Sequence, residues 1–449
     1  MKNTVKMMIL LAVALLVTSV TAFADGWTVE NNQWTYYQNG NKLYNTWKTD
    51  SAGNYYYLGS DGVMVTDRFV EDERYVDADG KMVTSAWRQL NGRWYYFDAA
   101  GKSIRDRIRQ INNRWYYFGP DGMETGWVSD DNGNYYYADP ADGHILTGTW
   151  KRLAPAEEMT PEESSFAGDG TYWYYFMGSN GRMVKAEADS YKTQNIEGRQ
   201  YCFDEYGCMQ TGWVRVEETD VPIAGFRYYN DTESIGPLGA AHTGWLSAYP
   251  PEQAGFGTDV VWYYFDSKGV PYYGTEIEDG TDDEALAAKF KKLSKNGTTN
   301  TYLFNKYGNP VYGLRKVVRK DGEVTSMYFG NANECCLQLG EKNITEADGT
   351  VSTFHFESNG YGYNGVKNNR LYYMGKLQKA TDDTYAYYTV KDKRYLVTRS
   401  GTLAKNVNNG GSKKDKYEFD YKSDSKGEDA GGLAGDSELD VPSFVVTDF

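Results

Sequence analysis

The sequence has 449 residues, a formal net charge of −15 and a mean hydropathy of −0.68, so it is acidic and polar overall. An acidic chain lacks the basic face that binding to phosphate requires, and nucleic acid is therefore excluded as the expected partner. With 41 Tyr, 12 Trp and 48 Gly, aromatic rings must supply most of the core and glycine must supply many turns.

The first residues are typical of a secretory signal peptide. An apolar run at 7–17 follows two lysines, and Ala22-Phe23-Ala24 is a small-x-small cleavage signal. The run is shorter than the roughly 20 residues that a membrane-spanning helix needs. We therefore expect residues 1–24 to be removed, and the chain from Asp25 onward to be extracellular without a membrane span.

Residues 25–274 repeat one unit with a period close to twenty. In one copy Trp87 opens the unit, a polar turn follows, the strand Trp94-Tyr95-Tyr96-Phe97 comes next, and Gly101 marks a second turn. Two short strands joined by such turns form a β-hairpin. One hairpin is marginal in water, but stacked hairpins cover one another's apolar faces. The sequence therefore predicts an all-β fold, a solenoid of β-hairpin repeats.

The aromatic strands carry rings on both faces. Trp94 and Tyr96 share one face, whereas Tyr95 and Phe97 share the other, because side chains alternate along a strand. We expect one face to fill the solenoid interior and the other to line grooves between successive hairpins.

Residues 275–405 are expected to contain an insertion helix and degenerate repeats. Thr281-Asp282-Asp283-Glu284 has capping-box spacing, and apolar residues then follow at helical intervals: Leu286, Phe290 and Leu293. This pattern predicts a short helix near 283–292. No tryptophan follows Trp262, so we expect the later repeats to keep the fold but to lose the binding aromatics.

The last segment, residues 406–449, is rich in acidic residues and has little periodicity. It also contains two glycine pairs and a lysine cluster. This composition is typical of a disordered acidic tail.

Four cysteines and three histidines are too scattered for a zinc site. Cys202 and Cys208 flank an expected hairpin turn, so a cross-strand disulfide is possible outside the cell. Cys335 and Cys336 could form only a strained adjacent bridge or stay free. Asp77-Ala78-Asp79-Gly80 lacks the full ligand set of a calcium loop and is interpreted as a turn. We expect no metal and no cofactor.

The repeat resembles the cell-wall-binding repeat family, which includes choline-binding modules and the glucan-binding repeats of extracellular glucosyltransferases. The shared motif is Gly-Trp, then Trp-Tyr-Tyr-Phe, then Gly-x-Met, then Thr-Gly-Trp. It is matched by the strand 94–97, by Gly122-Met123-Glu124-Thr125-Gly126-Trp127 and by Gly207-Cys208-Met209-Gln210-Thr211-Gly212-Trp213. More than ten copies in one frame carry the resemblance.

The resemblance also implies binding residues. In choline-binding relatives, two aromatic residues of one repeat and one of the next surround a quaternary ammonium, which cation–π attraction holds. The corresponding positions here are Trp27, Trp34 and Tyr57; Trp47, Tyr55 and Tyr75; and Trp87, Trp94 and Tyr117. The same rings could instead stack on sugars or serve only as core. Phe69 and Ile108 stand where other units open with Trp, which argues against a regular row of such sites.

The resemblance implies a secreted protein that attaches noncovalently to a bacterial cell-wall polymer. That polymer could be a choline-bearing teichoic acid or a glucan-like polysaccharide. Two alternatives are a structural surface scaffold without ligand sites and a non-catalytic partner of a wall-active hydrolase or transferase. No segment specifies a catalytic carboxylate pair, so we expect no enzymatic activity and no catalytic residues.

Overall fold

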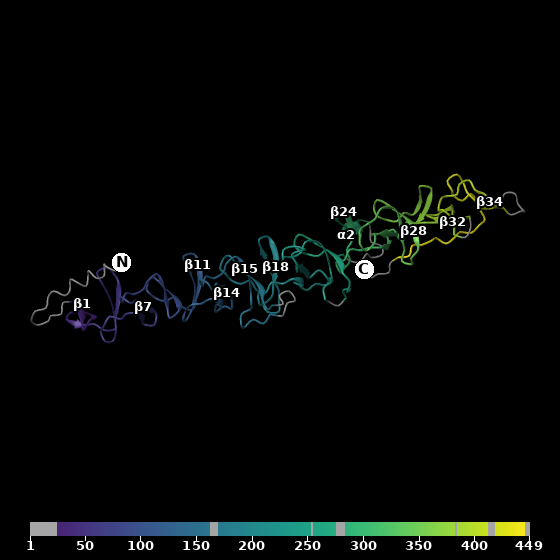
Figure 1. Ribbon diagram of the computed structural model, residues 1–449. Helices are drawn as coiled ribbons and strands as arrows, with labels where there is room; N and C mark the ends of the chain where they lie inside the picture. Colours follow the sequence, from purple (N-terminus) through teal and green to yellow (C-terminus); the bar gives the residue numbers. More distant parts are fainter. Residues whose placement is uncertain are drawn as a thin grey trace, which may run out of the picture. The chain divides into compact units, whose positions relative to one another are not determined.

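The computed structural model describes residues 25–161, 169–252, 255–274, 283–381, 384–411 and 418–444. The expected signal peptide, residues 1–24, lies outside the described residues. The chain divides into two compact units, one ending at Val184 and the other continuing from Lys185. Both consist of short antiparallel hairpins in chain order (Figure 1), so the expected all-β hairpin-repeat fold is confirmed.

The first unit contains the hairpins β1 (Gly26–Glu30) with β2 (Gln33–Gln38) and a third strand β3 (Asn41–Lys42), β4 (Thr46–Thr49) with β5 (Tyr55–Leu58), β6 (Arg68–Val70) with β7 (Arg74–Val76), β8 (Ala86–Leu90) with β9 (Arg93–Phe97), β10 (Arg107–Ile111) with β11 (Arg114–Gly119) and β12 (Gly122–Met123), β13 (Gly126–Ser129) with β14 (Tyr135–Ala138), and β15 (Thr149–Leu153) with β16 (Tyr172–Phe176).

The second unit contains β17 (Lys192–Ile196) with β18 (Arg199–Phe203), β19 (Gly212–Arg215) with β20 (Phe226–Tyr229), β21 (Gly244–Ala248) with β22 (Val261–Phe265), helix α2 (Asp283–Lys289), β23 (Lys291–Lys295) with β24 (Thr298–Tyr302), and β25 (Leu314–Val318) with β26 (Val324–Tyr328). It continues with a five-stranded sheet in the order β27 (Gly340–Thr345), β28 (Val351–Phe356), β31 (Lys376–Leu377), β30 (Arg370–Tyr373), β29 (Gly365–Lys367), then β32 (Tyr385–Val390) with β33 (Lys393–Thr398), and β34 (Asn408–Gly411) with β35 (Phe419–Lys422).

The Gly-x-Met element joins successive hairpins. The amide of Met64 donates to the carbonyl of Trp34 at 2.7 Å, and that of Met82 donates to the carbonyl of Tyr55 at 2.8 Å. Two turn glycines, Gly80 and Gly101, pack on the methionine of the preceding element, Met64 and Met82 respectively. A Cβ on Gly101, whose φ is 75°, would lie 2.6 Å from the sulfur of Met82. Glycine is therefore required there both by its backbone conformation and by the close approach of the methionine.

The last ring of the aromatic strand forms the core. Phe97, Phe118 and Phe176 are fully buried, whereas Trp94, three residues before Phe97, is 43% exposed. In one core cluster, Phe97 packs with Val83 and with Tyr75 of the preceding hairpin. The strand therefore has a buried end, which carries Phe97, and an exposed end, which carries Trp94.

Acidic residues at the repeat turns have a local structural role. The Asp77 carboxylate accepts the amides of Asp79 and Lys81 at 3.0 and 2.9 Å. Asp98 makes the equivalent bonds to Ala100 and Lys102, both at 2.9 Å. These are the bonds of an Asx turn, as the interpretation of Asp77–Gly80 as a turn predicts.

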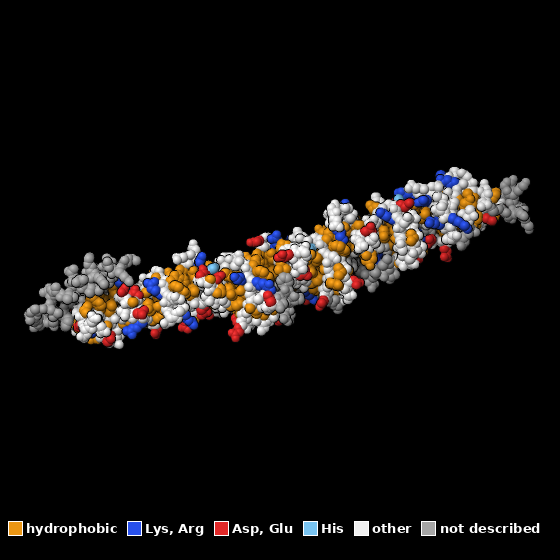
Figure 2. All heavy atoms as spheres, in the orientation of Figure 1, with side chains coloured by type: hydrophobic (Ala, Val, Ile, Leu, Met, Phe, Trp, Pro, Cys, Tyr) orange, Lys and Arg blue, Asp and Glu red, His pale blue; other side chains and the backbone are white. Residues whose placement is uncertain are grey.

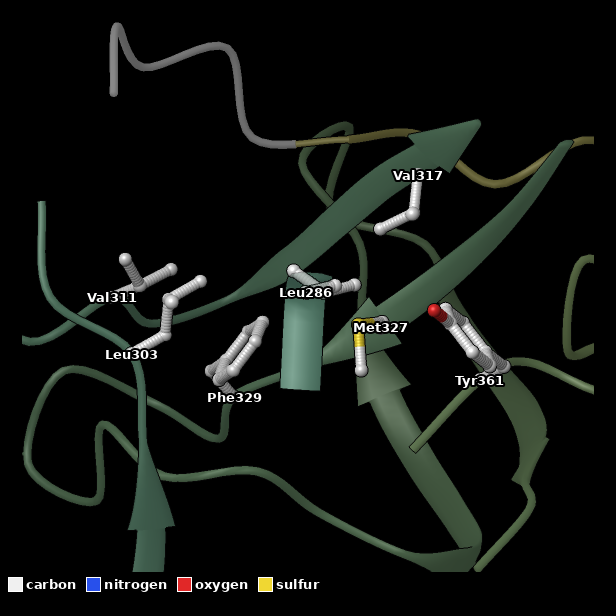
Figure 3. Packing of buried hydrophobic residues seen from close by; sticks show 7 residues of the cluster. All are labelled: Leu286, Leu303, Val311, Val317, Met327, Phe329 and Tyr361. Atoms are coloured by element: carbon white, nitrogen blue, oxygen red, sulfur yellow. The ribbon is translucent and has the colours of Figure 1, made fainter. Parts of the chain in front are cut away.

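The expected insertion helix is present as α2, from residue 283 to 289. Leu286 is buried in a cluster that draws on the hairpins after it (Figure 3). The helix ends before the expected residue 292 because β23 begins at Lys291, and Leu293 is a strand residue. The capping-box residues 281–282 lie outside the described residues.

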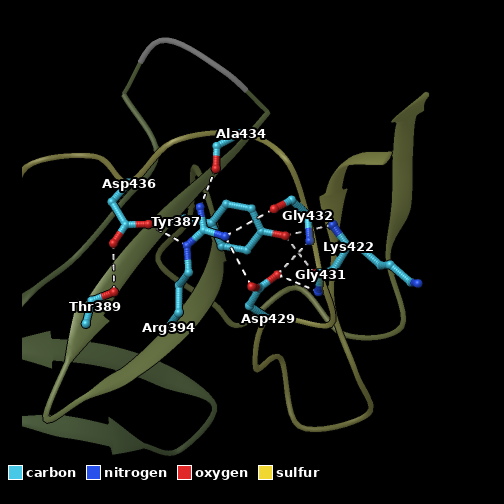
Figure 4. Close-up of polar contacts among 9 residues, drawn as sticks. All are labelled: Tyr387, Thr389, Arg394, Lys422, Asp429, Gly431, Gly432, Ala434 and Asp436. Carbon is cyan, nitrogen blue, oxygen red and sulfur yellow. Dashed lines mark hydrogen bonds and ion pairs between the residues drawn. The ribbon is translucent and has the colours of Figure 1, made fainter. Parts of the chain in front are cut away.

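The expectation of a disordered tail over 406–449 is wrong for its described residues, 406–411 and 418–444. β34 and β35 form a further hairpin, with Asn408 opposite Lys422. Asp429 and Asp436 then pair with Arg394 of β33, whose guanidinium lies 3.8 Å from the ring centre of Tyr387 (Figure 4). The acids do not repel one another as a solvated run, because arginine and lysine side chains of the repeats neutralise them.

The possible disulfide between Cys202 and Cys208 is not formed in the structure, and both side chains are buried. Cys202 packs with Val214 and Tyr229 in the core, and burial raises the pKa of its thiol to about 12. The turn between the cysteines is closed instead by Asp204, which accepts the amide of Cys208 at 2.8 Å. Cys335 and Cys336 are free as well.

Candidate aromatic binding site

Trp87, which opens its repeat, lies between two hairpins. Trp87 packs against Tyr96 of its own hairpin, with ring centres 5.3 Å apart, and against Tyr116 of the next hairpin at 4.9 Å. It also stacks on Phe118 at 5.6 Å. Hairpin β10–β11 thus presents Tyr116 and Phe118 to the tryptophan of the preceding hairpin.

The rings around Trp87 form the best-developed candidate site. Trp94 stands nearly perpendicular to Trp87, at 84° with 6.4 Å between ring centres. Trp94 is 43% exposed, and hydrophobic side chains reach the surface in this way along the face drawn in Figure 2. Two indoles and the phenol of Tyr116 therefore converge at the surface. Several ring faces around one point suit a cation that cannot form hydrogen bonds, or an apolar sugar face. We call Trp87, Trp94 and Tyr116 the first cage.

The strand register produces this arrangement. Trp87 is paired with Tyr96, and Trp94 lies two residues before Tyr96 on the same strand face. Tyr116 comes from the face of β11 that it shares with Phe118, so it is directed toward the preceding hairpin. Tyr117 lies on the opposite face of β11 and packs against the next core cluster, around Val128.

In the first and third predicted sets, the third ring is therefore the residue before the predicted one: Tyr56 rather than Tyr57, and Tyr116 rather than Tyr117. Trp27 contacts Tyr56 at 5.3 Å, in addition to Tyr36 at 5.2 Å, whereas Tyr57 contacts Trp47 at 5.1 Å. Trp34 keeps the predicted exposed position, at 38% exposure. Strand alternation was the signal that could have placed this ring. The face of an aromatic strand that packs against its own hairpin's tryptophan cannot also pack against the previous hairpin, so the third ring must come from the other face of the strand.

The second predicted set, Trp47, Tyr55 and Tyr75, is not brought together. Tyr75 packs against Phe69 and Phe97 instead. The position that Tyr116 holds in the first cage is taken by Arg74, which pairs with Val70. Arg74 forms an ion pair with Glu71 at 2.9 Å, and the indole nitrogen of Trp47 donates to the same carboxylate at 3.1 Å. Tyr55 is 49% exposed.

A second cage, which the sequence analysis did not identify, lies in the other unit. Trp245 meets Trp262 at 86° and 6.2 Å, and Tyr302 of the next hairpin lies 4.7 Å from Trp245. Phe304 stacks on Trp245 at 28°, the angle that Phe118 makes with Trp87. We call Trp245, Trp262 and Tyr302 the second cage. The missing Gly-Trp element of the next repeat concealed it, because Tyr302 is needed only as the third ring.

In the described part of the chain, no group of three or more His, Cys, Asp or Glu residues is arranged to hold a metal ion. Among the same residues, no helix is long and apolar enough to cross a membrane.

Comparisons with known proteins agree with the repeat pattern. The choline-binding repeat model matches residues 83–122 and 105–150, and the putative cell wall binding repeat model matches 45–64 and 261–270. These matches include all three residues of the first cage and Trp262 of the second. Glucosyltransferase-S of Streptococcus mutans serotype c is 28% identical over 147 residues, which are 31% of this chain and 9% of the enzyme.

Solved structures of Streptococcus pneumoniae proteins are also similar. CbpJ is 21% identical with a TM-score of 0.41, covering 72% of this chain and 99% of CbpJ. The modular autolysin LytC is 17% identical with a TM-score of 0.37, covering 65% of this chain and 54% of LytC. The segments 45–64, 83–150 and 261–270 are therefore repeats of the choline-binding and cell-wall-binding type, and the same motif recurs along the chain.

Proposed function

We propose that this protein is a secreted, non-catalytic surface protein that binds a choline-bearing polymer of the bacterial cell wall. The observation that carries the proposal is the first cage, where Trp87, Trp94 and Tyr116 converge at the surface within residues that match the choline-binding repeat model. A quaternary ammonium has no hydrogen-bond donor, so ring faces are the groups that can recognise it.

The charge of the chain suits such a ligand. With a net charge of −15, the protein attracts cations over a distance of about a Debye length, roughly 8 Å at physiological ionic strength. Exposed aromatic rings then supply the short-range selectivity for an apolar cation over Na⁺ or K⁺, which keep their hydration shells.

A glucan is the second candidate ligand. The similarity to Glucosyltransferase-S favours it, and exposed indoles such as Trp94 can stack on sugar rings. The two candidates differ in one respect that can be measured, because free choline competes for a cation cage and does not compete for a sugar platform.

The test is retention of the full chain on three matrices: choline-bearing cell walls, walls grown without choline, and an insoluble α-glucan. We expect retention only on the choline-bearing walls, with release by free choline. Retention on glucan that choline does not reverse would establish the second candidate, and retention on none would refute a binding function. Labelled wall and glucan incubated with the pure protein test the proposal that it is non-catalytic.

Trp94→Ala, with Trp34→Ala as its matched control, links retention to the first cage. Trp34 has the same strand position in the first hairpin and a similar exposure, 38% against 43%. Trp27 contacts Tyr36 and Tyr56, but in the described part of the chain no ring contact joins it to Trp34, as one joins Trp87 to Trp94. Trp94→Ala should reduce retention much more than Trp34→Ala. Sequencing the N-terminus of the exported protein tests secretion, and we expect it to begin at Asp25.

A further inference from the structure

The second cage already contains a cation from the same chain. The ammonium nitrogen of Lys295 lies 3.5 Å from the ring centre of Trp262 and 5.0 Å from that of Trp245. Both distances are within the range of a cation–π contact. In the described part of the chain, no lysine or arginine head group lies over the rings of Trp87 or Trp94. The two cages thus consist of the same kinds of rings, but among the described residues only the second has a lysine of the chain over its indoles.

A longer hairpin brings Lys295 to this position. Beyond Tyr116, hairpin β10–β11 has two more residue pairs and then turns at Asn112–Asn113. Beyond Tyr302, hairpin β23–β24 has four more pairs, and Lys295 opposite Thr298 is the last of them. The two additional pairs extend the hairpin past the rings, so its tip lies beside the indoles of the preceding hairpin.

One hydrogen bond and a tight turn fix the extended tip. The indole nitrogen of Trp245 donates to the carbonyl of Ser294 at 2.9 Å, which holds the strand residue next to Lys295 against the cage. The turn itself, Asn296 and Gly297, has φ of 52° and 79°. Positive φ at both positions is the geometry of a tight type I′ turn. Lys295 therefore starts from a defined backbone position next to the rings it covers.

We propose that the second cage is an ammonium site that the chain closes with its own Lys295, so that external ligands bind there only when this lysine is displaced or removed. The inference rests on the proposed function for the chemistry of the ligand. A tethered group acts at an effective concentration in the millimolar range or above. A free quaternary ammonium that binds a single shallow cage weakly cannot compete with it at ordinary concentrations.

This arrangement gives the two cages different roles. The first cage is open to the wall polymer, whereas the second is held closed within the repeats by Lys295. The lysine bridges two successive hairpins, since it belongs to β23 and its aromatic partners belong to β21 and β22. It therefore acts as a specificity-determining residue, which decides which of two similar cages takes an external cation.

The test is calorimetric titration of the full chain with tetramethylammonium, comparing the wild type with Lys295→Ala. We expect the variant to bind one additional equivalent, and we expect Lys295→Ala combined with Trp262→Ala to lose it. Lys292→Ala is the matched control, because it removes the same charge from an exposed residue of the same strand, and it should add no site. Lys295→Arg keeps a cation over the rings and should also add none.

The outcomes separate this inference from the proposed function. If Lys295→Ala gains no site while the wild type binds at the first cage, the inference is overturned and the proposed function stands. If Lys295→Ala gains a Trp262-dependent site while the wild type binds nothing, the inference stands and the role of the first cage is overturned. A ligand-free readout is the NMR shift of the Lys295 side-chain protons, which ring currents should move upfield. Unshifted protons would refute the closed cage.

Discussion

Replacing Trp94 with alanine should separate binding from stability. Each ring face in a cation cage contributes about 0.5–2 kcal/mol, depending on desolvation. Trp94 is 43% exposed, so the middle of this range applies, and a loss of about 1–1.5 kcal/mol corresponds to roughly a five- to tenfold weaker Kd for choline. The folded state should lose little, because Trp94 is a surface ring, and changes at such positions usually cost about 0.5 kcal/mol.

Trp87→Ala should behave differently. Trp87 packs against rings of two hairpins, among them Tyr96, Tyr116 and Phe118, so its removal should cost about 2–4 kcal/mol of unfolding free energy in addition to binding. Calorimetric titration with choline and urea unfolding of both variants give the two quantities. Equal Kd values for Trp94→Ala and the wild type would refute the cage, and so would an equal loss on Trp34→Ala.

Three further predictions concern the fold. Lys376→Met should lower the free energy of unfolding, measured with urea, by about 3–5 kcal/mol. The substitution leaves the fully buried Glu346 carboxylate without the Lys376 ammonium, which lies 3.0 Å away. A change within 1 kcal/mol would show that this ion pair is dispensable. A hydrogen bond from the side chain of Asn54 lowers the pKa of Asp50 to about 2, below the value of about 3.9 in an unfolded chain. The stability that the ionised Asp50 contributes should therefore be complete above pH ~4 and lost as the pH falls through about 2. An NMR titration midpoint near 4 for Asp50 would contradict this. Thiol titration of the unreduced, denatured protein should give four free thiols, and a count of two would restore the disulfide between Cys202 and Cys208.

The repeat unit was predictable because its signal is local and recurs many times. Each strand such as 94–97 carries its own alternation, and each turn has its own glycine or aspartate. The burial of Phe97 and the exposure of Trp94 both follow from one strand that has a buried and an exposed end. The short helix was predictable for the same reason, since its periodicity lies within one segment.

The contacts between hairpins were less predictable. Choosing Tyr116 rather than Tyr117 required two pieces of information together: the alternation of β11, which the sequence shows, and the face of β11 that meets the preceding hairpin, which one hairpin alone does not show. Lys295 is a second example, because its role depends on two additional residue pairs that bring it to the rings of an earlier hairpin.

The prediction of a disordered tail was wrong because it used the acidic composition of the segment alone, without the side chains elsewhere in the chain that pair with these acids. Acidic residues in an unpaired segment favour disorder, but Asp429 and Asp436 find Arg394 more than thirty residues earlier. Tyr421 also packs against Tyr387, with ring centres 5.8 Å apart. The alternating aromatics Phe419 and Tyr421 were a local signal for a further strand, and this signal outweighed the acidic composition.

The most direct test of the central claim is a crystal structure of the full chain with bound choline. We expect the choline ammonium to lie between Trp87, Trp94 and Tyr116, and the Lys295 ammonium to remain over Trp262. Choline bound elsewhere, or bound at the second cage with Lys295 displaced while the first cage is empty, would contradict it.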